Sequence, residues 1–385
     1  MTTVRSESIH DAHRRSPQSM LRGVDHVGWW VGNARAFSAF LRSAFGFQPV
    51  AYAGPETGVS DRVTHVLVQG DIRFLVSGAL SPVSPIAEHV RRHGDGVRDV
   101  CFSVDDPTAA YDMALEGGAV AERPPEVDED EHGPVGHAAI RTYGETVHSF
   151  VDRSAYDGVF APGFATSHLA SNGGSQEPTP TSAGVGLRHI DHIVGNVEQG
   201  RMDDWVSFYE RALGLAQFMH FGADQISTEH SALASTVLWN GGTVVLPINE
   251  PAHGLRKSQI QEYLDYYGSA GVQHLALHTS DIVAAVRSMR NRGVRFLSVP
   301  PEYYDEARER MVGVELPWDD LSELGILVDR DPGGHLLQTF TEPLCDRPTV
   351  FFEIIQRAGA KGFGEGNFKA LFQAIERAQA ARGNL

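Results

Sequence analysis

The chain has 385 residues, of which 42% are hydrophobic and 21% are charged, a composition typical of a globular protein long enough for two ordinary domains. Its formal net charge of −17 at pH 7 argues against binding to nucleic acid or to an anionic membrane, because both need clustered Lys and Arg. Two cysteines, Cys101 and Cys345, are too few for a disulfide framework or a thiolate metal site, and they indicate a reducing cytoplasm. We find no run of about 18 apolar residues, so we expect no membrane span.

The first 20 residues lack the apolar segment of a signal peptide, and we expect residues 1–20 to form a polar, disordered arm. Ordered structure is expected from Leu21 on, with a strand over 23–31 and a helix over 34–45 that ends at Gly46. A second segment begins in the same way near residue 190, where a strand is followed by a helix over 201–213 that ends at Gly214. The two openings indicate that the chain consists of two similar halves.

Other residues recur in the same order in both halves, and chance similarity of short strands does not account for several ordered matches. We therefore infer an internal duplication. The matches are Asp25-His26 with Asp191-His192, Gly46 with Gly214, the Gly-Val pair at 96–97 with that at 271–272, and Gly144 and Phe150 with Gly334 and Phe340.

Between the two halves lies a stretch, 167–186, whose Gly, Ser, Pro and Thr content is unsuited to packing a core. We therefore predict an α+β protein with an N-terminal domain over 21–160, a linker over 161–186 and a C-terminal domain over 187–385. The last of these would carry an additional C-terminal helix.

Glu353 is a carboxylate inside an apolar strand. Its neighbours in the run 350–355 are Val, Phe and Ile, which is typical of a strand that is covered on both faces. An ionised side chain in such a place is destabilising by several kcal/mol unless a cation or hydrogen bonds compensate. We therefore expect a metal or a positive partner at Glu353; the alternative is a residue at a strand edge that pairs with Arg347 or Arg357.

Only the second half holds two histidines and a carboxylate on three strands. His192 and His274 occupy corresponding strand positions there, whereas the first half has Asp99 opposite His274 and no counterpart of Glu353. Two imidazoles and one carboxylate, with three positions left open, form the facial triad suited to Fe(II) that binds both O₂ and a chelating substrate. Zinc and Mn(II) are the competing occupants.

The residues after Glu353 predict a mobile cover for such a site. A glycine-rich loop, 362–366, leads to Asn367, which we expect to cap the N-terminus of a helix. Phe368, Leu371, Phe372 and Ile375 follow at helical spacing and would form one apolar face. We expect an amphipathic C-terminal lid helix on a flexible hinge.

Several runs of the second half resemble the 4-hydroxyphenylpyruvate dioxygenase family, whose vicinal-oxygen-chelate domains are paired βαβββ modules that form open barrels. The resemblance covers roughly residues 21–385. The runs that carry it are IDHIVGNV, PINEPA, KSQIQEYL, GVQHLAL, PTVFFEIIQR and GFGEGNFKALF. It implies Fe(II) held by His192, His274 and Glu353, a metal-free structural first half, and a homodimer or homotetramer.

The resemblance also implies the side chains that meet the substrate. Hydroxyl and amide groups would bond a phenol hydroxyl and a 2-oxo carboxylate, and phenylalanines would stack on an aromatic ring. The alternative for each is an ordinary structural role, since buried amides often bond only backbone and an isolated Phe is usually core. Catalytic roles fall on Gln273, Gln338, Asn249 and Ser235, and substrate contacts on Gln259, Phe340, Phe363, Asn367, Phe368 and Pro247.

The implied reaction converts 4-hydroxyphenylpyruvate and O₂ to homogentisate and CO₂ by oxidative decarboxylation, ring hydroxylation and side-chain migration, as in tyrosine catabolism. The nearest alternative is a hydroxymandelate synthase, which oxidises the benzylic carbon of the same substrate. That family tends to have Thr and Ile where this chain has Pro247 and Asn249, and Ile where it has Phe368. Two further alternatives are an extradiol catechol dioxygenase and a non-catalytic protein of the same fold that binds a small molecule.

Overall fold

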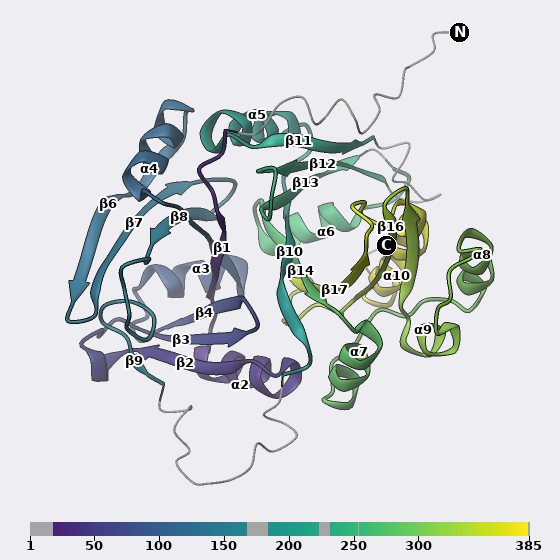
Figure 1. Ribbon diagram of the computed structural model, residues 1–385, viewed down its shortest axis with the longest axis horizontal. Helices are drawn as coiled ribbons and strands as arrows, with labels where there is room; N and C mark the ends of the chain where they lie inside the picture. The colour runs from purple at the N-terminus through teal and green to yellow at the C-terminus, as the bar shows by residue number, and fades with distance from the viewer. Residues whose placement is uncertain (1–17, 168–183, 223–231, 253, 384–385) are drawn as a thin grey trace.

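The computed structural model describes residues 18–167, 184–222, 232–252 and 254–383. Most of the expected arm, 1–20, and the centre of the expected linker, 161–186, lie outside the described residues. Two strongly curved sheets with helices on their outer sides lie next to each other, one from each half of the chain (Figure 1). The predicted α+β class and the tandem modules are confirmed.

The first sheet has the strand order β6-β7-β8-β5-β1-β4-β3-β2-β9. Its strands are β1 (Gly23–Trp30), β2 (Gln48–Ala53), β3 (Arg62–Gln69), β4 (Ile72–Ala79), β5 (Gly96–Ser103), β6 (Val120–Asp130), β7 (Gly133–Arg141), β8 (Val147–Asp152) and β9 (Ala165–Thr166). The helices of this half are α2 (Ala34–Phe45), α3 (Pro85–His93), α4 (Pro107–Glu116) and the short 3₁₀ helix η1 (Pro55–Thr57).

The second sheet has the order β11-β12-β13-β10-β14-β17-β16-β15. Its strands are β10 (Leu187–Asn196), β11 (Ala216–Phe221), β12 (Ala232–Trp239), β13 (Val245–Ala252), β14 (Gly271–Thr279), β15 (Leu327–Asp331), β16 (Gly334–Phe340) and β17 (Phe351–Ala358). The helices are α5 (Met202–Leu213), α6 (Gln259–Tyr267), α7 (Ile282–Asn291), α8 (Glu302–Arg310), α9 (Trp318–Leu324), α10 (Phe368–Ala381) and the 3₁₀ helix η2 (Glu365–Asn367).

The two strand orders are the same once β9 is set aside, so each half is a pair of βαβββ modules. The parallel pairs β1·β4 and β5·β8 correspond to β10·β13 and β14·β17. One match inferred from sequence is wrong: Phe150 lies on β8, whose counterpart is β17, whereas Phe340 lies on β16. Glycine and phenylalanine are common in strands, so a Gly and a Phe at similar spacing can be matched between two strands that are not structural counterparts. Strand β9 lies within the segment predicted as a linker and pairs with β2.

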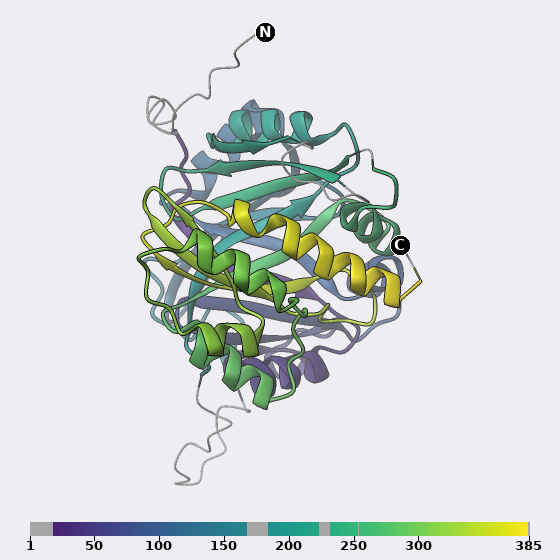
Figure 2. The same ribbon diagram turned by 90° about the vertical axis from the view of Figure 1, so that its right-hand side faces the viewer.

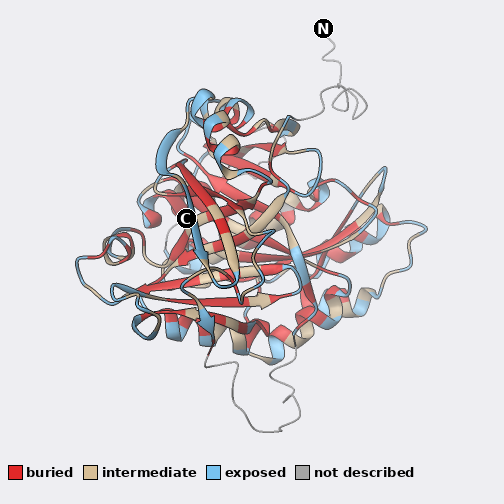
Figure 3. Cartoon of the chain, turned by 60° about the vertical axis from the view of Figure 1, so that its left-hand side comes forward, coloured by how far each residue is buried: buried red, intermediate tan, exposed pale blue. Residues whose placement is uncertain are grey.

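A continuous hydrophobic core joins the two halves, and buried residues run along the strands of both sheets (Figure 3). Phe352 on β17 contacts Phe45 and Phe74 of the first half, with ring centroids 5.1 and 5.8 Å apart. Because successive strand residues face opposite ways, Glu353 then faces into the second barrel. Strand β17 is buried on both faces, as its composition predicts.

Helix α10 crosses the open side of the second sheet (Figure 2). A separate apolar cluster brings Phe372 of this helix together with Tyr263 and Tyr267 of α6. Asn367 stands at the N-cap position, but its side chain makes no capping hydrogen bond and accepts one from the Tyr303 hydroxyl instead. Among the residues that the structure describes, none of the helices combines the length and apolar character that a membrane crossing needs.

Candidate metal centre and substrate pocket

Three adjacent strands bring His192, His274 and Glu353 together inside the second barrel. His192 is on β10, His274 on β14 and Glu353 on β17, and all three side chains face the same side of the sheet. Their ligand atoms lie within 4.8 Å of one another. The Nε2 atoms of His192 and His274 are 3.3 and 3.6 Å from Oε2 of Glu353.

This spacing fits a metal ion. An ion about 2.1 Å from three ligands at right angles separates the ligand atoms by about 3.0 Å, so a small contraction would complete the coordination. Two nitrogens and one carboxylate oxygen form a donor set for a first-row transition metal. The residues present therefore fit the metal cofactor that a dioxygenase of this fold requires.

Each imidazole is held through its other nitrogen, which leaves Nε2 free to bind a metal. Nδ1 of His192 is 2.8 Å from Asp191 Oδ1, and Nδ1 of His274 is 3.0 Å from Gln273 Oε1. Asp191 in turn accepts two hydrogen bonds from Arg357, at 2.7 and 2.8 Å. Arg357, considered from sequence as a partner of Glu353, thus pairs with Asp191 instead. Arg347 donates to backbone carbonyls.

The pKa values of the triad show that the buried Glu353 carboxylate is ionised and needs a cation beside it. Burial alone would raise the pKa of Glu353, but the two imidazoles lower it to about 2. Burial alone would lower the pKa of His192, but the charge of Glu353 raises it to about 9. Without a metal, protonated His192 is therefore the cation that balances Glu353. A metal ion that binds to Nε2 of His192 displaces this proton.

A cavity of about 90 Å³ extends from the triad to helix α10. It brings together all of the expected site residues except Asn367, which is fully buried behind the cavity wall against Tyr303. The family resemblance had implied a substrate contact for Asn367. The expected residues in the lining are Ser235, Pro247, Asn249, Gln259, Gln273, Gln338, Phe340, Phe363 and Phe368.

The aromatic side chains surround the ligand imidazoles. Phe363 meets the His192 ring edge to face at 5.1 Å, and Phe340 meets the His274 ring in the same way at 6.4 Å. Phe351, which sequence reasoning missed, stacks on His274 at 4.8 Å. Its place two residues before Glu353, on the same face of β17, was the signal that could have identified it.

Helix α10 is fastened to helix α6 beside the pocket. Arg382, at the C-terminal end of α10, donates to both oxygens of Glu262, at 3.3 and 2.7 Å. A second cavity, of about 460 Å³, adjoins the first along this seam and shares four lining residues with it, Gln259, Gln273, Phe351 and Ile375.

The first half preserves the supporting residues of this site but not its ligands. His26 bonds Asp25 at 2.7 Å, and Arg153 bonds Asp25 as Arg357 bonds Asp191. By strand register Asp99 takes the place of His274. Ser149, which donates to Asp99 at 2.6 Å, takes the place of Glu353.

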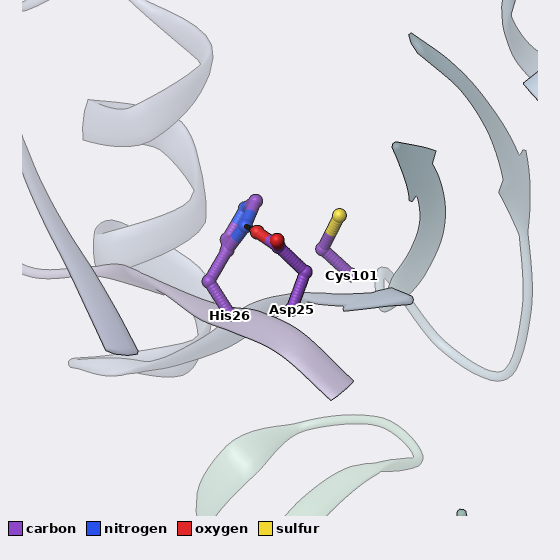
Figure 4. A group of neighbouring side chains, drawn as sticks. All are labelled: Asp25, His26 and Cys101. Carbon is purple, nitrogen blue, oxygen red and sulfur yellow. Dashed lines mark hydrogen bonds and ion pairs between the residues drawn. The ribbon is translucent and has the colours of Figure 1, made fainter. Parts of the chain in front are cut away.

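Asp25, His26 and Cys101 lie close enough to suggest a metal site in the first half (Figure 4). Figure 4 shows the His26 ring against the Asp25 carboxylate and the Cys101 thiol to one side. Both oxygens of Asp25 are already engaged by His26 and Arg153, and burial raises the pKa of Cys101 well above its usual value. Because its carboxylate is already engaged, this group is poorly suited to hold a metal.

The chain was compared with known proteins. The family model for the Glyoxalase/Bleomycin resistance protein/Dioxygenase superfamily matches residues 23–135 and 189–339. A 4-hydroxyphenylpyruvate dioxygenase of Yarrowia lipolytica is 46% identical over 94% of both chains, and one of Dictyostelium discoideum is 47% identical over 95% of this chain and all of its own. The solved structure of a 4-hydroxymandelate synthase mutant from Streptomyces coelicolor superposes with a TM-score of 0.82 at 33% identity, covering 93% of this chain and 99% of that one.

Proposed function

Since the chain belongs to the 4-hydroxyphenylpyruvate dioxygenase family within the Glyoxalase/Bleomycin resistance protein/Dioxygenase superfamily, we propose that it converts 4-hydroxyphenylpyruvate and O₂ to homogentisate and CO₂ with Fe(II) as its metal. The observation that carries the proposal is the complete set of His192, His274 and Glu353 in the second half, at the base of a pocket lined by amides and phenylalanines. Zinc and Mn(II) are the other metals that suit these ligands.

When bound, Fe(II) would supply the activation of O₂ that oxidative decarboxylation and ring hydroxylation require. The protein's own contribution is to hold the substrate and to exclude water. The side-chain carbonyl of Gln273 accepts a hydrogen bond from Nδ1 of His274, so its amide N–H groups remain to bind the substrate. Ser235 and Asn249 lie opposite each other on β12 and β13 and offer a hydroxyl and an amide side by side.

The phenylalanines would fix the substrate ring by stacking and edge contacts. Phe340 and Phe363 flank the two ligand imidazoles, whereas Phe368 enters the pocket from helix α10 and contacts Phe221 at 5.4 Å. The cavity of about 90 Å³ is smaller than the roughly 300–1,000 Å³ of typical ligand pockets, and a shift of α10, which lines it, would enlarge it for the substrate. We propose that the helix is a lid and that the ion pair between Arg382 and Glu262 helps to keep it closed.

We further propose that the enzyme is a cytoplasmic homodimer or homotetramer whose first half, 21–160, has a structural role. Both cysteines are free, which suits a reducing compartment. The replacement of two ligand positions by Asp99 and Ser149 supports a first half without a catalytic metal. Light scattering during gel filtration would give the oligomeric state.

Product analysis tests the proposed reaction. The protein would be loaded anaerobically with Fe(II), supplied with 4-hydroxyphenylpyruvate, O₂ and ascorbate, and its products separated by chromatography against authentic standards. The expected result is homogentisate with a matching amount of CO₂, and loss of both in His274→Ala. Mass alone is insufficient because homogentisate and hydroxymandelate are isomers.

Two other results would overturn this proposal. If the product were hydroxymandelate, the chain would be a hydroxymandelate synthase, as the structural neighbour is named. Pro247, Asn249 and Phe368 would then not determine which product forms. Bound iron with neither product nor O₂ uptake would indicate a different 2-oxo acid or a binding protein. Phe368→Ile is expected to shift oxidation toward the benzylic carbon or to uncouple O₂ uptake from product.

A further inference from the structure

A second set of two imidazoles and one carboxylate lies at the junction of the two halves, away from the catalytic pocket. His89 and His93 are four residues apart on α3, so both project from one side of that helix. Glu145 lies in the turn between β7 and β8 and meets both rings. The three ligand atoms lie within 4.8 Å of one another, as do those of the catalytic set.

The spacing of this cluster fits a tetrahedral ion. Nδ1 of His89 is 3.1 Å from Oε2 of Glu145, and Nε2 of His93 is 3.2 Å from the same oxygen. A zinc ion about 2.0 Å from tetrahedral ligands separates them by about 3.3 Å. The cluster therefore needs little adjustment to hold such an ion, and its spacing is closer to the ideal than that of the catalytic triad.

The orientation of His93 leaves a lone pair pointing at a carboxylate. Its Nδ1 is 2.6 Å from the carbonyl oxygen of Tyr267, to which it donates, so its Nε2 carries the free electron pair. That Nε2 is buried and has no hydrogen-bond partner among the described residues. An imidazole nitrogen 3.2 Å from a carboxylate oxygen needs a cation between the two atoms, which is either a proton or a metal ion.

The surroundings support a metal rather than a proton as that cation. His89 is 1% exposed, and its Nδ1 faces the same Glu145 oxygen as Nε2 of His93, although that Nε2 makes no hydrogen bond within the described part of the chain. Arg92 binds the other oxygen of Glu145, which orients the carboxylate as outer partners of metal ligands do.

The arginines nearby are paired with carboxylates, and Glu88 and Glu122 each pair with two of them, since Arg91 also contacts Glu88 and Arg141 also contacts Glu122. Arg92 also pairs with Glu88 at 2.7 Å, and Arg98 pairs with Glu122 at 2.7 Å. A cavity of about 410 Å³ reaches His89 and Glu145 from outside, which provides a route for an ion and room for water as a fourth ligand.

We propose that His89, His93 and Glu145 form a second metal site, for a divalent transition metal that prefers nitrogen ligands and tetrahedral geometry, such as Zn²⁺. The site has a structural role, because its ligands come from the first half while the Tyr267 carbonyl that orients His93 belongs to α6 of the second. The same helix begins with Gln259 in the catalytic pocket, so the ion joins the first half to a wall of that pocket.

Zinc stoichiometry in a Glu353→Ala background tests the proposal, because that change disables the catalytic site and relieves its buried charge. Equilibrium dialysis against Zn²⁺, followed by elemental analysis, is expected to give about one bound ion per chain. His93→Asn keeps a donor for the Tyr267 carbonyl but removes the Nε2 ligand. It is expected to weaken binding by more than the roughly 10–100-fold typical of outer-sphere changes.

The matched control is His132→Asn, which removes an exposed histidine that also has carboxylate neighbours, Glu131 and Asp157. Zinc binding is expected to survive this change. The proposal would be overturned if His132→Asn lost zinc while His93→Asn retained it. It would also be overturned if the Glu353→Ala protein retained no ion.

Cobalt spectroscopy provides a second test that does not depend on stoichiometry. Co²⁺ bound in the Glu353→Ala protein is expected to show the intense visible absorption of a tetrahedral site, and Glu145→Gln, at a partly exposed position where folding is retained, is expected to abolish it. Circular dichroism of each variant establishes that the fold is intact. A spectrum that Glu145→Gln leaves unchanged would assign the ion to other residues.

Discussion

Asp191 and Asp25 are equivalent carboxylates, but only Asp191 lies behind a histidine of the proposed catalytic metal site. Each bonds the histidine that follows it and accepts a bidentate contact from an arginine, Arg357 or Arg153. The hydrogen bonds from these arginines and histidines hold the pKa of both aspartates well below its usual range, although burial alone would raise it. The internal duplication therefore supplies a control for any change at Asp191.

We expect Asp191→Asn to lower the affinity for Fe(II) by about 10–100-fold, because the amide no longer fixes the His192 tautomer or strengthens its basicity. Asp25→Asn removes the same contacts in the first half and is expected to leave Fe(II) affinity unchanged while destabilising the fold to a similar degree. Anaerobic Fe(II) titration and thermal melting of both variants separate these effects. Equal Fe(II) affinity in the two variants would contradict the orienting role of Asp191.

The proposed metal ligands could be picked out as candidates from the sequence, whereas the residues that hold them in place could not. Glu353 was noticeable because a carboxylate within an apolar strand needs a cation. His192 and His274 were noticeable because only the second half contains two such histidines together with a glutamate. Arg357 lies four residues beyond Glu353, on the same face of β17, but the register that brings it to Asp191 is set by pairing with β14. Asn367 lies outside the cavity lining because the hydroxyl of Tyr303, from the distant helix α8, donates a hydrogen bond to its side-chain oxygen.

At the scale of elements, the glycine loop between β17 and α10 lies directly against the pocket. Gly364 adopts a positive φ of 78°, and a Cβ atom there would lie 2.3 Å from Nε2 of Gln338. Sequence predicted a flexible hinge at these glycines. The structure indicates a close contact as well, since Gly364 allows the loop to approach a pocket amide.

Gly364→Ala is expected to reduce kcat/KM by at least about tenfold, because the methyl group displaces Gln338 or moves the start of α10. The control is Gly293→Ala, which carries a comparable φ of 91° but has open space around the added Cβ. It introduces the same backbone strain, about 1 kcal/mol or more, without the contact. Steady-state kinetics of both variants, beside their melting temperatures, check this. Comparable losses of activity in the two would attribute the effect to strain alone.

At the scale of the whole molecule, the two halves fold around a shared interior that sequence alone did not predict. The duplication was evident from recurring residues, but the packing of Phe352 against the first half depends on which face of β17 points toward that half. The same interface holds a buried histidine, His148 on β8. Its Nε2 is 2.8 Å from the hydroxyl of Tyr209 on α5, and its Nδ1 is 3.1 Å from the Val100 carbonyl.

His148 is expected to make the association of the halves sensitive to acid. Burial lowers its pKa from 6.5 to about 4, so the folded protein holds it neutral while the unfolded chain protonates it at higher pH. The contribution of neutral His148 to the free energy of unfolding is therefore fully present above pH 6.5. As the pH falls from 6.5 toward 4, the free energy of unfolding decreases by up to about 3 kcal/mol on account of this residue. His148→Asn keeps a donor for the Val100 carbonyl but has no proton to gain. Urea unfolding at steps across this range is expected to show a shallower fall in the free energy of unfolding for His148→Asn than for the parent, whatever the difference between them at pH 7. Parallel pH profiles for the two proteins would mean that other buried groups determine acid unfolding.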